Sequence, residues 1–415
     1  MRLAARLSRV PALEAASPSL PRDGVSALCG AASPVQAQLR AARGRRRCFG
    51  AQVMVSSQRF EEFIRAELSY LGQRQPQPLK LEQIVHASTP GKVAQLVLTE
   101  LPYRFAFRIK HLESHPSFAE QPELGEIRNI FSTSFRDLRL AEPVVEEPRA
   151  EDLAGFTEVI CSLRKRHQPV VALLAEALRK MHPQGTWDDD IQKWADTFLQ
   201  SRVTTEMLTS HYVAIVQGSS EQSAEAMSSG RVGIVDTKCN PGQICQEAAE
   251  AVREGIVTRG DPDIRIEVKT NNCSYANAEI EFSYIPKYLF YILQELLRNS
   301  ARATLEASGN SPEDLAARPV TITVCADKKE VAIRISDQGG GVPFEHARRI
   351  WSYTFSTSKL PYEEYVGRAS PLSGWGMGLP ASRLYASYLG GRLELMNMPG
   401  TGVDAYLFLK RISLD

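Results

Sequence analysis

A glutamate and an asparagine four residues apart, Glu295 and Asn299, have the types and spacing to do chemistry. On an α-helix this spacing places both side chains on one face, about one turn apart. The carboxylate could accept a proton, and the amide oxygen suits a hard cation as a ligand. An ordinary solvated polar pair has the same spacing, so the surrounding elements must decide between the two interpretations.

The residues around this pair predict a long, mostly buried helix over residues 286–307. Its apolar residues recur at spacings of three and four, and they are Tyr288, Leu289, Ile292, Leu293 and Leu296. Polar side chains on a core helix need a reason to be there, because burial costs them their water. A functional site at Glu295 and Asn299, with Arg298 and Arg302 nearby, is therefore expected.

A second candidate is the stretch DQGGGV, residues 337–342, which directly follows an expected strand over 331–336. The carboxylate of Asp337 can accept a hydrogen bond, and the amino group of an adenine is a natural donor for it. Gly339 and Gly341 would let the backbone approach a flat ligand closely. A glycine-rich turn leaving a strand is the alternative interpretation.

The third candidate is the stretch SGWGMGLP, residues 373–380, which contains three closely spaced glycines. Pro380 suits the first turn of a helix and Gly390 with Gly391 suits its end, which predicts a helix over 381–389. Its unpaired N–H groups would point at the glycine-rich loop, and phosphates fit such a place. The sequence contains neither a Walker lysine motif nor a protein-kinase glycine-rich loop followed by a strand lysine.

The first of two predicted domains covers residues 58–217. Apolar residues recur there at helical spacings, with expected breaks at Pro102 and at residues 143–148 and 182–185, which predicts a helical bundle of the four-helix type. Residues 218–230 are small and polar and indicate a linker.

The second predicted domain covers residues 231–415 and contains all three candidates. Stretches rich in β-branched or alternating residues predict strands over 264–269, 320–324, 331–336, 392–396 and 404–409. Strands interleaved with helices, in a mostly antiparallel order, predict a layered α/β sandwich. The expected fold class is therefore a two-domain α+β protein.

Residues 1–50 differ in composition from the rest, with nine Arg, no Lys, and only Glu14 and Asp23 as acids. This Arg-rich, acid-poor pattern is typical of a mitochondrial transit peptide, expected to be disordered, and a disordered basic tail is the alternative. Removing nine positive and two negative charges takes the net charge from +1 to −6. A mildly acidic protein gives no support for nucleic-acid binding.

The remaining composition excludes two further classes. The seven cysteines form no CxxC or zinc-like cluster and are expected to be free thiols in a reducing compartment. No apolar run approaches the 18 or so residues that a membrane span needs, so an integral membrane protein is not expected.

Taken together, E-x-x-x-N, D-x-G-x-G and G-x-G-x-G resemble the ATP-binding fold shared by gyrase, the Hsp90 chaperones, histidine kinases and MutL, the GHKL or Bergerat fold. The resemblance implies ATP and Mg²⁺ as cofactors, with Asn299 holding the metal and Asp337 receiving the adenine amino group. It also implies that residues 374–378 form a lid over the phosphates.

The amino-acid sequences in and around the motifs are closer to one branch of that superfamily. ELLRNSARATLE, IRISDQGGGVP, TFSTS, SPLSGWGMGLPASRLYASYLGG and GTGVDAYLFLKRI are similar to the mitochondrial 2-oxo acid dehydrogenase kinases, the pyruvate and branched-chain types. In the helical half, LPYRFAFRI and SRVTTEMLTSHYVAI are similar to this family too. The resemblance covers nearly all of residues 58–412.

This resemblance implies a serine kinase in which Glu295 is the general base. It implies a decarboxylase α subunit of a 2-oxo acid dehydrogenase complex as substrate, the lipoyl domain of the acyltransferase as docking site, a homodimer, and the mitochondrial matrix as location. The nucleotide-binding residues that it implies are Asn299, Arg302, Asp337, Gly339, Gly341, Ser356, Thr357, Gly374, Trp375, Gly376, Met377, Gly378 and Leu379.

Three positions depart from the family pattern. Tyr291 stands where pyruvate-type members usually carry histidine, Val403 stands where a hydroxyl is usual near the adenine, and Glu206 stands where arginine is common, which puts regulation by small acids in doubt. Tyr291 matches the branched-chain type, whereas SPLSG and the short lid resemble the pyruvate type, which we favour.

Three alternatives stay open besides the pyruvate-type kinase. One is a branched-chain 2-oxo acid dehydrogenase kinase, and another is a nucleotide-binding regulatory pseudokinase. The third is a histidine kinase whose acceptor would be His167, a residue otherwise expected to be solvated or to cap a helix.

Overall fold

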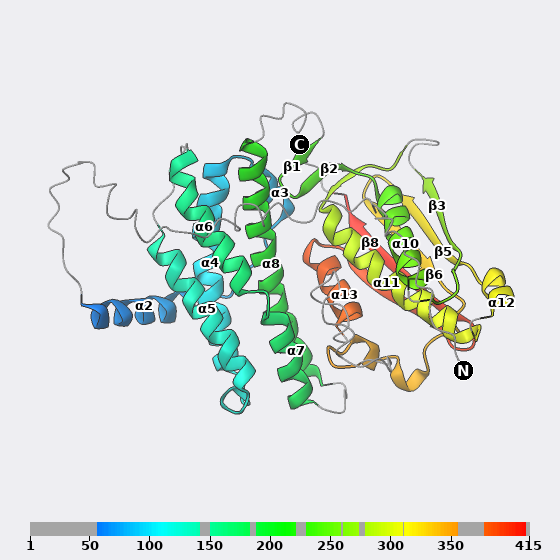
Figure 1. Cartoon of the computed structure of the whole chain (residues 1–415), viewed down its shortest axis with the longest axis horizontal. Coiled ribbons are helices and arrows are strands. Elements are labelled where there is room, and N and C mark those ends of the chain that lie inside the picture. Colours follow the sequence, from blue (N-terminus) through cyan, green and yellow to red (C-terminus); the bar gives the residue numbers. More distant parts are fainter. Residues whose placement is uncertain are drawn as a thin grey trace, which may run out of the picture. The chain divides into compact units, whose positions relative to one another are not determined.

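The N-terminal half of the chain is a bundle of helices (Figure 1), which confirms the predicted helical character. In this computed structural model α4 packs against α2, α5 and α8, while α6 contacts both α5 and α8. Only residues 167–169 separate α6 from α7. The helices are α2 (Ser57–Leu71), α3 (Leu81–His86), α4 (Pro90–Glu113), α5 (Pro122–Leu140), α6 (Ala150–Arg166), α7 (Val170–Met181) and α8 (Asp189–Ser220), with a 3-10 turn η2 (Phe118–Glu120) before α5.

The structure describes eight stretches of the chain. The expected transit peptide lies outside them, and so do residues 221–229, the greater part of the expected linker. The described residues are 56–141, 150–182, 188–220, 230–258, 260–273, 279–309, 311–355 and 377–411.

The expected break at Pro102 is wrong, because α4 continues through this proline to Glu113. A proline inside a helix costs about 3 kcal/mol, since it removes a hydrogen bond and crowds the preceding turn. Here Val97, Leu101 and Phe105 are fully buried around it. Burial of one such side chain contributes about 1.5–3 kcal/mol, so packing on both sides of Pro102 outweighs the local cost.

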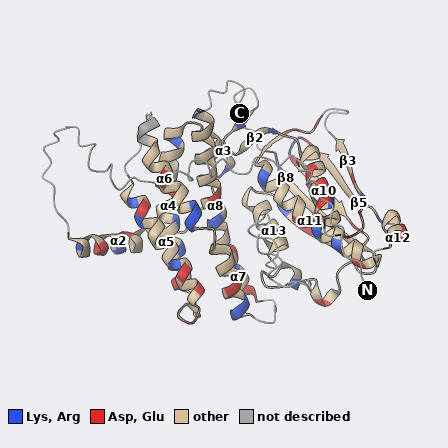
Figure 2. Ribbon diagram, in the orientation of Figure 1, with Lys and Arg blue, Asp and Glu red and all other residues tan. Residues whose placement is uncertain are grey.

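Charges of both signs lie along the bundle helices α2, α5 and α7 (Figure 2). Some pair across neighbouring helices, as Arg139 does with Glu67 at 2.7 Å and Arg136 with Glu61 at 2.9 Å. Exposed pairs of this kind contribute at most about 1 kcal/mol each. The buried apolar residues, rather than the ion pairs, therefore hold the bundle together.

The C-terminal half contains a five-stranded sheet covered on one face by helices (Figure 1). Its strand order is β3-β5-β6-β8-β7; β3 and β5 are parallel and the other pairs are antiparallel. This arrangement confirms the layered α/β sandwich and the α+β class. The strands are β3 (Ile266–Asn272), β5 (Val320–Ala326), β6 (Glu330–Ser336), β7 (Arg392–Met398) and β8 (Gly402–Lys410).

Helices α10, α11 and α13 form the covering layer. Along β6, Val331, Ile333 and Ile335 are buried because alternate residues of a strand point to the same face. The helices are α10 (Pro241–Val257), α11 (Pro286–Ala307) and α13 (Gly378–Tyr388), with a short α12 (Pro312–Ala317) before β5 and the 3-10 turns η3 (Phe344–His346) and η4 (Arg349–Trp351) after β6. The boundaries of α11 match the helix expected from the sequence.

A second, smaller sheet was not expected. Its three antiparallel strands have the order β1-β2-β4 and are β1 (Arg231–Val232), β2 (Val235–Cys239) and β4 (Phe282–Tyr284). Strands β1 and β4 have only two and three residues and show no period, and the five residues of β2 include only two apolar ones, Val235 and Cys239. Within the described residues five cysteines are free thiols, as expected, and no helix has the length and apolar character needed to cross a bilayer.

Candidate nucleotide and catalytic site

Helix α11 carries the first candidate pair. It begins at Pro286, which suits the first helical position because its missing N–H would have no partner there. Glu295 is only 6 % exposed, whereas Asn299, one turn further on, is exposed. Arg298 Nη1 lies 2.9 Å from Glu295 Oε1, so an ion pair holds the buried carboxylate. The side chain of Arg302 pairs with Glu306 at 2.8 Å on the more exposed side.

The first turn of α13 lies directly against Glu295. A Cβ atom built on Gly378 would be 2.3 Å from Glu295 Oε2, so a larger residue here would push the Glu295 carboxylate out of its position. Met377, just before the helix, is fully buried, and Leu379 is partly exposed. The glycine therefore permits a close approach between the end of the glycine-rich stretch and the carboxylate on α11.

Asp337 follows β6 and is 6 % exposed. Its Oδ1 accepts hydrogen bonds from the backbone N–H groups of Gly339 at 3.0 Å and Val403 at 3.2 Å. Its Oδ2 accepts one from the hydroxyl of Ser300 at 2.9 Å. Burial raises the pKa of Asp337 above its ordinary value, although these three hydrogen bonds act in the opposite direction.

The glycine-rich turn after Asp337 packs against α11. A Cβ on Gly339 would lie 2.5 Å from Ala303 Cβ, so no larger side chain fits between the turn and the helix. Gly341 has a φ of +73° and lies beside the carbonyl oxygen of Met398 on β7. This turn places Asp337 over the same helix that carries Glu295 and Asn299.

The structure thus brings together residues from all three candidate motifs. Helix α11 is contacted by Asp337 through Ser300, by Gly339 at Ala303, and by Gly378 at Glu295. Five of the expected binding residues, Ser356, Thr357, Gly374, Trp375 and Gly376, lie outside the described residues.

Two site residues were missed from the sequence. Ser300 follows Asn299 directly but bonds to Asp337 on another element, which no pattern of spacing reveals. A Cβ on Gly402 would be 2.0 Å from the carbonyl oxygen of Asp337, so β8 also approaches the site closely. The GTG stretch containing Gly402 was noted only as part of a family resemblance.

The residues present fit Mg²⁺ bound together with nucleotide phosphates. Within the described part of the chain, His, Cys, Asp and Glu form no cluster of three or more that could hold a metal ion. Mg²⁺ commonly uses one or two protein oxygens and completes its octahedron with phosphates and water. The exposed amide of Asn299, one turn from Glu295, suits that kind of site.

Two of the residues that depart from the family pattern, Tyr291 and Glu206, contact Tyr385 of α13. The ring of Tyr291 packs against Tyr385 of α13 at 5.2 Å between centroids. Glu206 accepts a hydrogen bond from Tyr385 at 3.0 Å and lies 3.6 Å from Lys287. Burial acts to raise the pKa of Glu206, but nearby Arg202 and Lys287 and the Tyr385 hydroxyl outweigh it and lower the pKa.

His167 directly follows α6, where its backbone N–H donates to the carbonyl oxygen of Leu163 at 3.0 Å and so caps the helix, but its side chain is only partly exposed rather than fully solvated. Its ring packs edge-on against Phe105 and Phe131, and Nε2 lies 2.9 Å from the Ser134 hydroxyl. Burial holds its pKa well below the ordinary value. An imidazole packed in this way is a poor acceptor for a phosphoryl group from ATP.

Comparison with known proteins agrees with this geometry. Residues 78–236 match a family model described as mitochondrial branched-chain alpha-ketoacid dehydrogenase kinase, and residues 285–412 match one described as histidine kinase-, DNA gyrase B-, and HSP90-like ATPase. The chain is 31% identical to mitochondrial pyruvate dehydrogenase (acetyl-transferring) kinase isozyme 3 of Mus musculus, covering 82% of each chain.

A plant relative gives the same result. The chain is 33% identical to the mitochondrial pyruvate dehydrogenase (acetyl-transferring) kinase of Arabidopsis thaliana, over 77% of this chain and 84% of the relative. The chain therefore belongs to the mitochondrial 2-oxo acid dehydrogenase kinases, protein kinases that join a helical domain to an ATP-binding domain of the gyrase and Hsp90 type.

Proposed function

We propose that this kinase uses Mg-ATP to phosphorylate and inactivate the decarboxylase α subunit of the pyruvate dehydrogenase complex in the mitochondrial matrix. The observation that carries the proposal is the meeting, on α11, of the buried Glu295, the exposed Asn299 and the loop that begins at Asp337. The names of the relatives support the substrate complex.

The nucleotide would be bound by three elements. Asp337 would receive the adenine amino group, and Gly339 and Gly341 would border the base. Asn299 would hold Mg²⁺, which neutralises phosphate charge when bound. Arg302, on the same helix, would face the phosphates. The lid residues Gly374, Trp375, Gly376, Met377, Gly378 and Leu379 would close over them, with Ser356 and Thr357 at the nucleotide's edge.

Glu295 would act as the general base toward the acceptor serine. Its carboxylate is ion-paired with Arg298 and covered by the first turn of α13, so it is shielded from bulk water. A shielded carboxylate within reach of a substrate hydroxyl can accept its proton as the phosphoryl group is transferred. Phosphoryl transfer otherwise depends on positioning and on charge stabilisation.

A branched-chain 2-oxo acid dehydrogenase complex is the second candidate substrate. Two observations favour it. The family model that matches residues 78–236 is described as branched-chain alpha-ketoacid dehydrogenase kinase. Tyr291 stands where pyruvate-type members usually carry histidine, and this matches the branched-chain type. Docking on the lipoyl domain of the acyltransferase, and a homodimeric kinase, are parts of the proposal that hold for either complex.

Incubation with Mg-ATP and the purified pyruvate and branched-chain complexes, side by side, tests the proposal. Phosphate is expected on a serine of the pyruvate decarboxylase α subunit, together with loss of that complex's activity. Phosphorylation of the branched-chain complex alone would select the second candidate. Nucleotide binding without transfer to either complex would indicate a pseudokinase, and acid-labile phosphate on the protein itself would indicate a histidine kinase.

A further inference from the structure

The hydroxyl of Ser300 donates a hydrogen bond to Asp337 Oδ2 at 2.9 Å. Both residues are 6 % exposed, so little water competes for this contact. Ser300 follows Asn299 on α11, but its side chain is buried whereas that of Asn299 is exposed. The contact connects α11, which carries the candidate metal ligand Asn299, to Asp337, the candidate acceptor for the adenine amino group.

The hydrogen bonds already made by Asp337 leave it little remaining capacity. A carboxylate has about four acceptor positions, two on each oxygen. Both positions of Oδ1 are used by the backbone N–H groups of Gly339 and Val403, and one position of Oδ2 is used by Ser300. One position on Oδ2 is left for a ligand.

We propose that Ser300 is a positioning residue that fixes the Asp337 carboxylate with one acceptor position directed to the purine, and thereby selects adenine over guanine. The inference rests on the proposed function, in which Asp337 receives the adenine amino group. Adenine offers an N–H donor at its 6-position, whereas guanine offers a carbonyl oxygen there. A carboxylate oxygen fixed at this place therefore attracts the adenine amino group and repels the guanine carbonyl oxygen.

The same contact affects the ionisation of Asp337. Burial and the nearby carboxylate of Asp404 on β8 raise its pKa, while the bonds from Gly339, Ser300 and Val403 lower it. Without the Ser300 hydroxyl the pKa rises further. A protonated carboxyl presents an O–H donor, which suits the guanine oxygen and no longer accepts freely from adenine.

The test compares Ser300→Ala with Ser308→Ala by calorimetric titration of Mg-ATP and Mg-GTP between pH 5.5 and 8. Ser308 is a matched control, because it is also 6 % exposed and its hydroxyl donates at 2.9 Å, to the carbonyl oxygen of Leu305. Ser300→Ala is expected to weaken ATP binding roughly 5- to 20-fold, because the Asp337 carboxylate is no longer held ready to accept from adenine. GTP binding should not weaken, and the acid limb of ATP binding should move to higher pH.

Ser300→Thr keeps the hydroxyl and should restore the preference for ATP. Should Ser300→Ala fail to fold, Ser300→Cys gives the same comparison, since a thiol is a weak donor of similar size. Unchanged ATP affinity, ATP preference and pH profile in Ser300→Ala, when Asp337→Asn abolishes ATP binding, would overturn this inference and leave the proposed function intact. Absence of ATP binding by the wild-type chain would instead overturn the proposed function.

Discussion

At the scale of single residues, Glu295 is where the proposed chemistry is most directly tested. Glu295→Gln keeps the size of the side chain but removes the proton acceptor and the ion pair with Arg298. Because general base catalysis contributes roughly 10²–10⁴-fold, turnover should fall by about that factor while ATP affinity changes little. Phosphate transfer to the complex and calorimetric ATP binding measure the two effects separately.

The control for this change is Glu313→Gln, an exposed glutamate on α12. It should transfer phosphate at the wild-type rate. Wild-type turnover in Glu295→Gln would remove Glu295 from the role of base, and loss of ATP binding in that variant would mean that its main effect is on the fold of the site.

The sequence was sufficient to single out Glu295, Asn299 and Asp337, because each residue type and spacing has a chemical meaning on its own element. It could not reveal that Ser300 bonds to Asp337 across 37 positions of sequence. That contact depends on how far α11 is displaced along the sheet, which is set by packing rather than by any local pattern. The close approach of Gly378 to Glu295 also depends on how the elements pack, so the sequence did not predict it.

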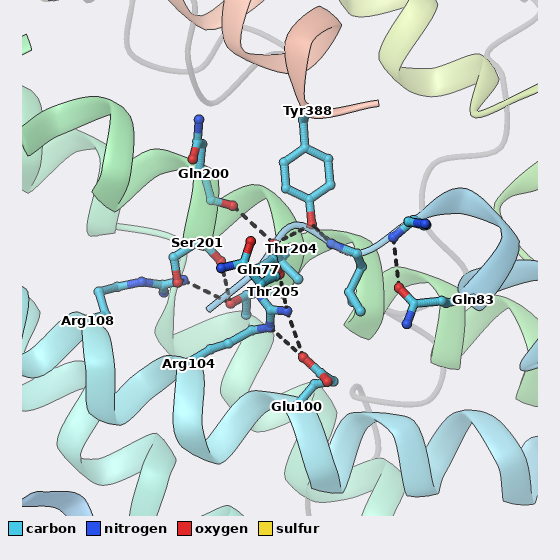
Figure 3. A network of polar contacts seen from close by, with 12 residues as sticks. Gln77, Gln83, Glu100, Arg104, Arg108, Gln200, Ser201, Thr204, Thr205 and Tyr388 are labelled. Carbon is cyan, nitrogen blue, oxygen red and sulfur yellow. Dashed lines mark hydrogen bonds and ion pairs between the residues drawn. The ribbon is translucent and has the colours of Figure 1, made fainter. Parts of the chain in front are cut away.

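At the scale of elements, α13 joins the site to the helical bundle. Its first residue, Gly378, lies against Glu295, and its last, Tyr388, meets the bundle. The Tyr388 hydroxyl makes a short hydrogen bond with Thr204 of α8 and accepts one from the backbone N–H of Leu79 at 3.2 Å (Figure 3). The eleven residues of α13 span about 16 Å, so one rigid helix contacts both Glu295 and the helical bundle.

Tyr388→Phe removes both hydrogen bonds and leaves the N–H of Leu79, a residue 4 % exposed, without its acceptor. The free energy of unfolding should fall by about 1–3 kcal/mol, as expected for an unsatisfied buried donor. Denaturant unfolding measures this change. Tyr70→Phe is the control, because Tyr70 is 66 % exposed and its change should stay within about 0.5 kcal/mol. Equal stability of the two variants would exclude the proposed anchoring role of Tyr388.

Elements with a clear period were predicted well and irregular ones were not. The period of α11 and the alternation of β5 and β6 follow from the face that each element buries. Helix α10 was missed, and the break expected at Pro102 was wrong, because local propensity is weak compared with tertiary packing. Strands β1 and β4 are too short to carry a pattern, and β2 has only two apolar residues among its five.

At the scale of the whole molecule, stability should depend on pH through His211. This residue of α8 is fully buried, with Nε2 3.1 Å from the carbonyl oxygen of Ala87 and Nδ1 3.5 Å from the backbone N–H of Ile234. Burial lowers its pKa below the ordinary value near 6.5. In the neutral ring Nε2 donates and Nδ1 accepts, so a second proton would face the Ile234 N–H.

Because the unfolded chain binds this proton more readily, the folded state loses stability as the pH falls below about 6.5, by up to about 1.4 kcal/mol per pH unit. The loss stops only below the lowered pKa of the folded state. Denaturant unfolding at pH 7.5 and 5.5 should show this fall. His211→Gln keeps a side-chain donor but cannot titrate, so its fall should be smaller. His167, whose pKa is also lowered, contributes in the same direction, and an identical fall in both proteins would assign the effect to His167 and other groups.

The strand order has a consequence for biosynthesis. Strand β8 lies between β6 and β7, although both precede it in the chain. The helices of the bundle have all left the ribosome once residue 220 is free, whereas the main sheet cannot close until residues 402–410 have emerged. Until then β6 and β7 each expose an unpaired backbone edge, the kind of surface that other chains add to and that molecular chaperones cover.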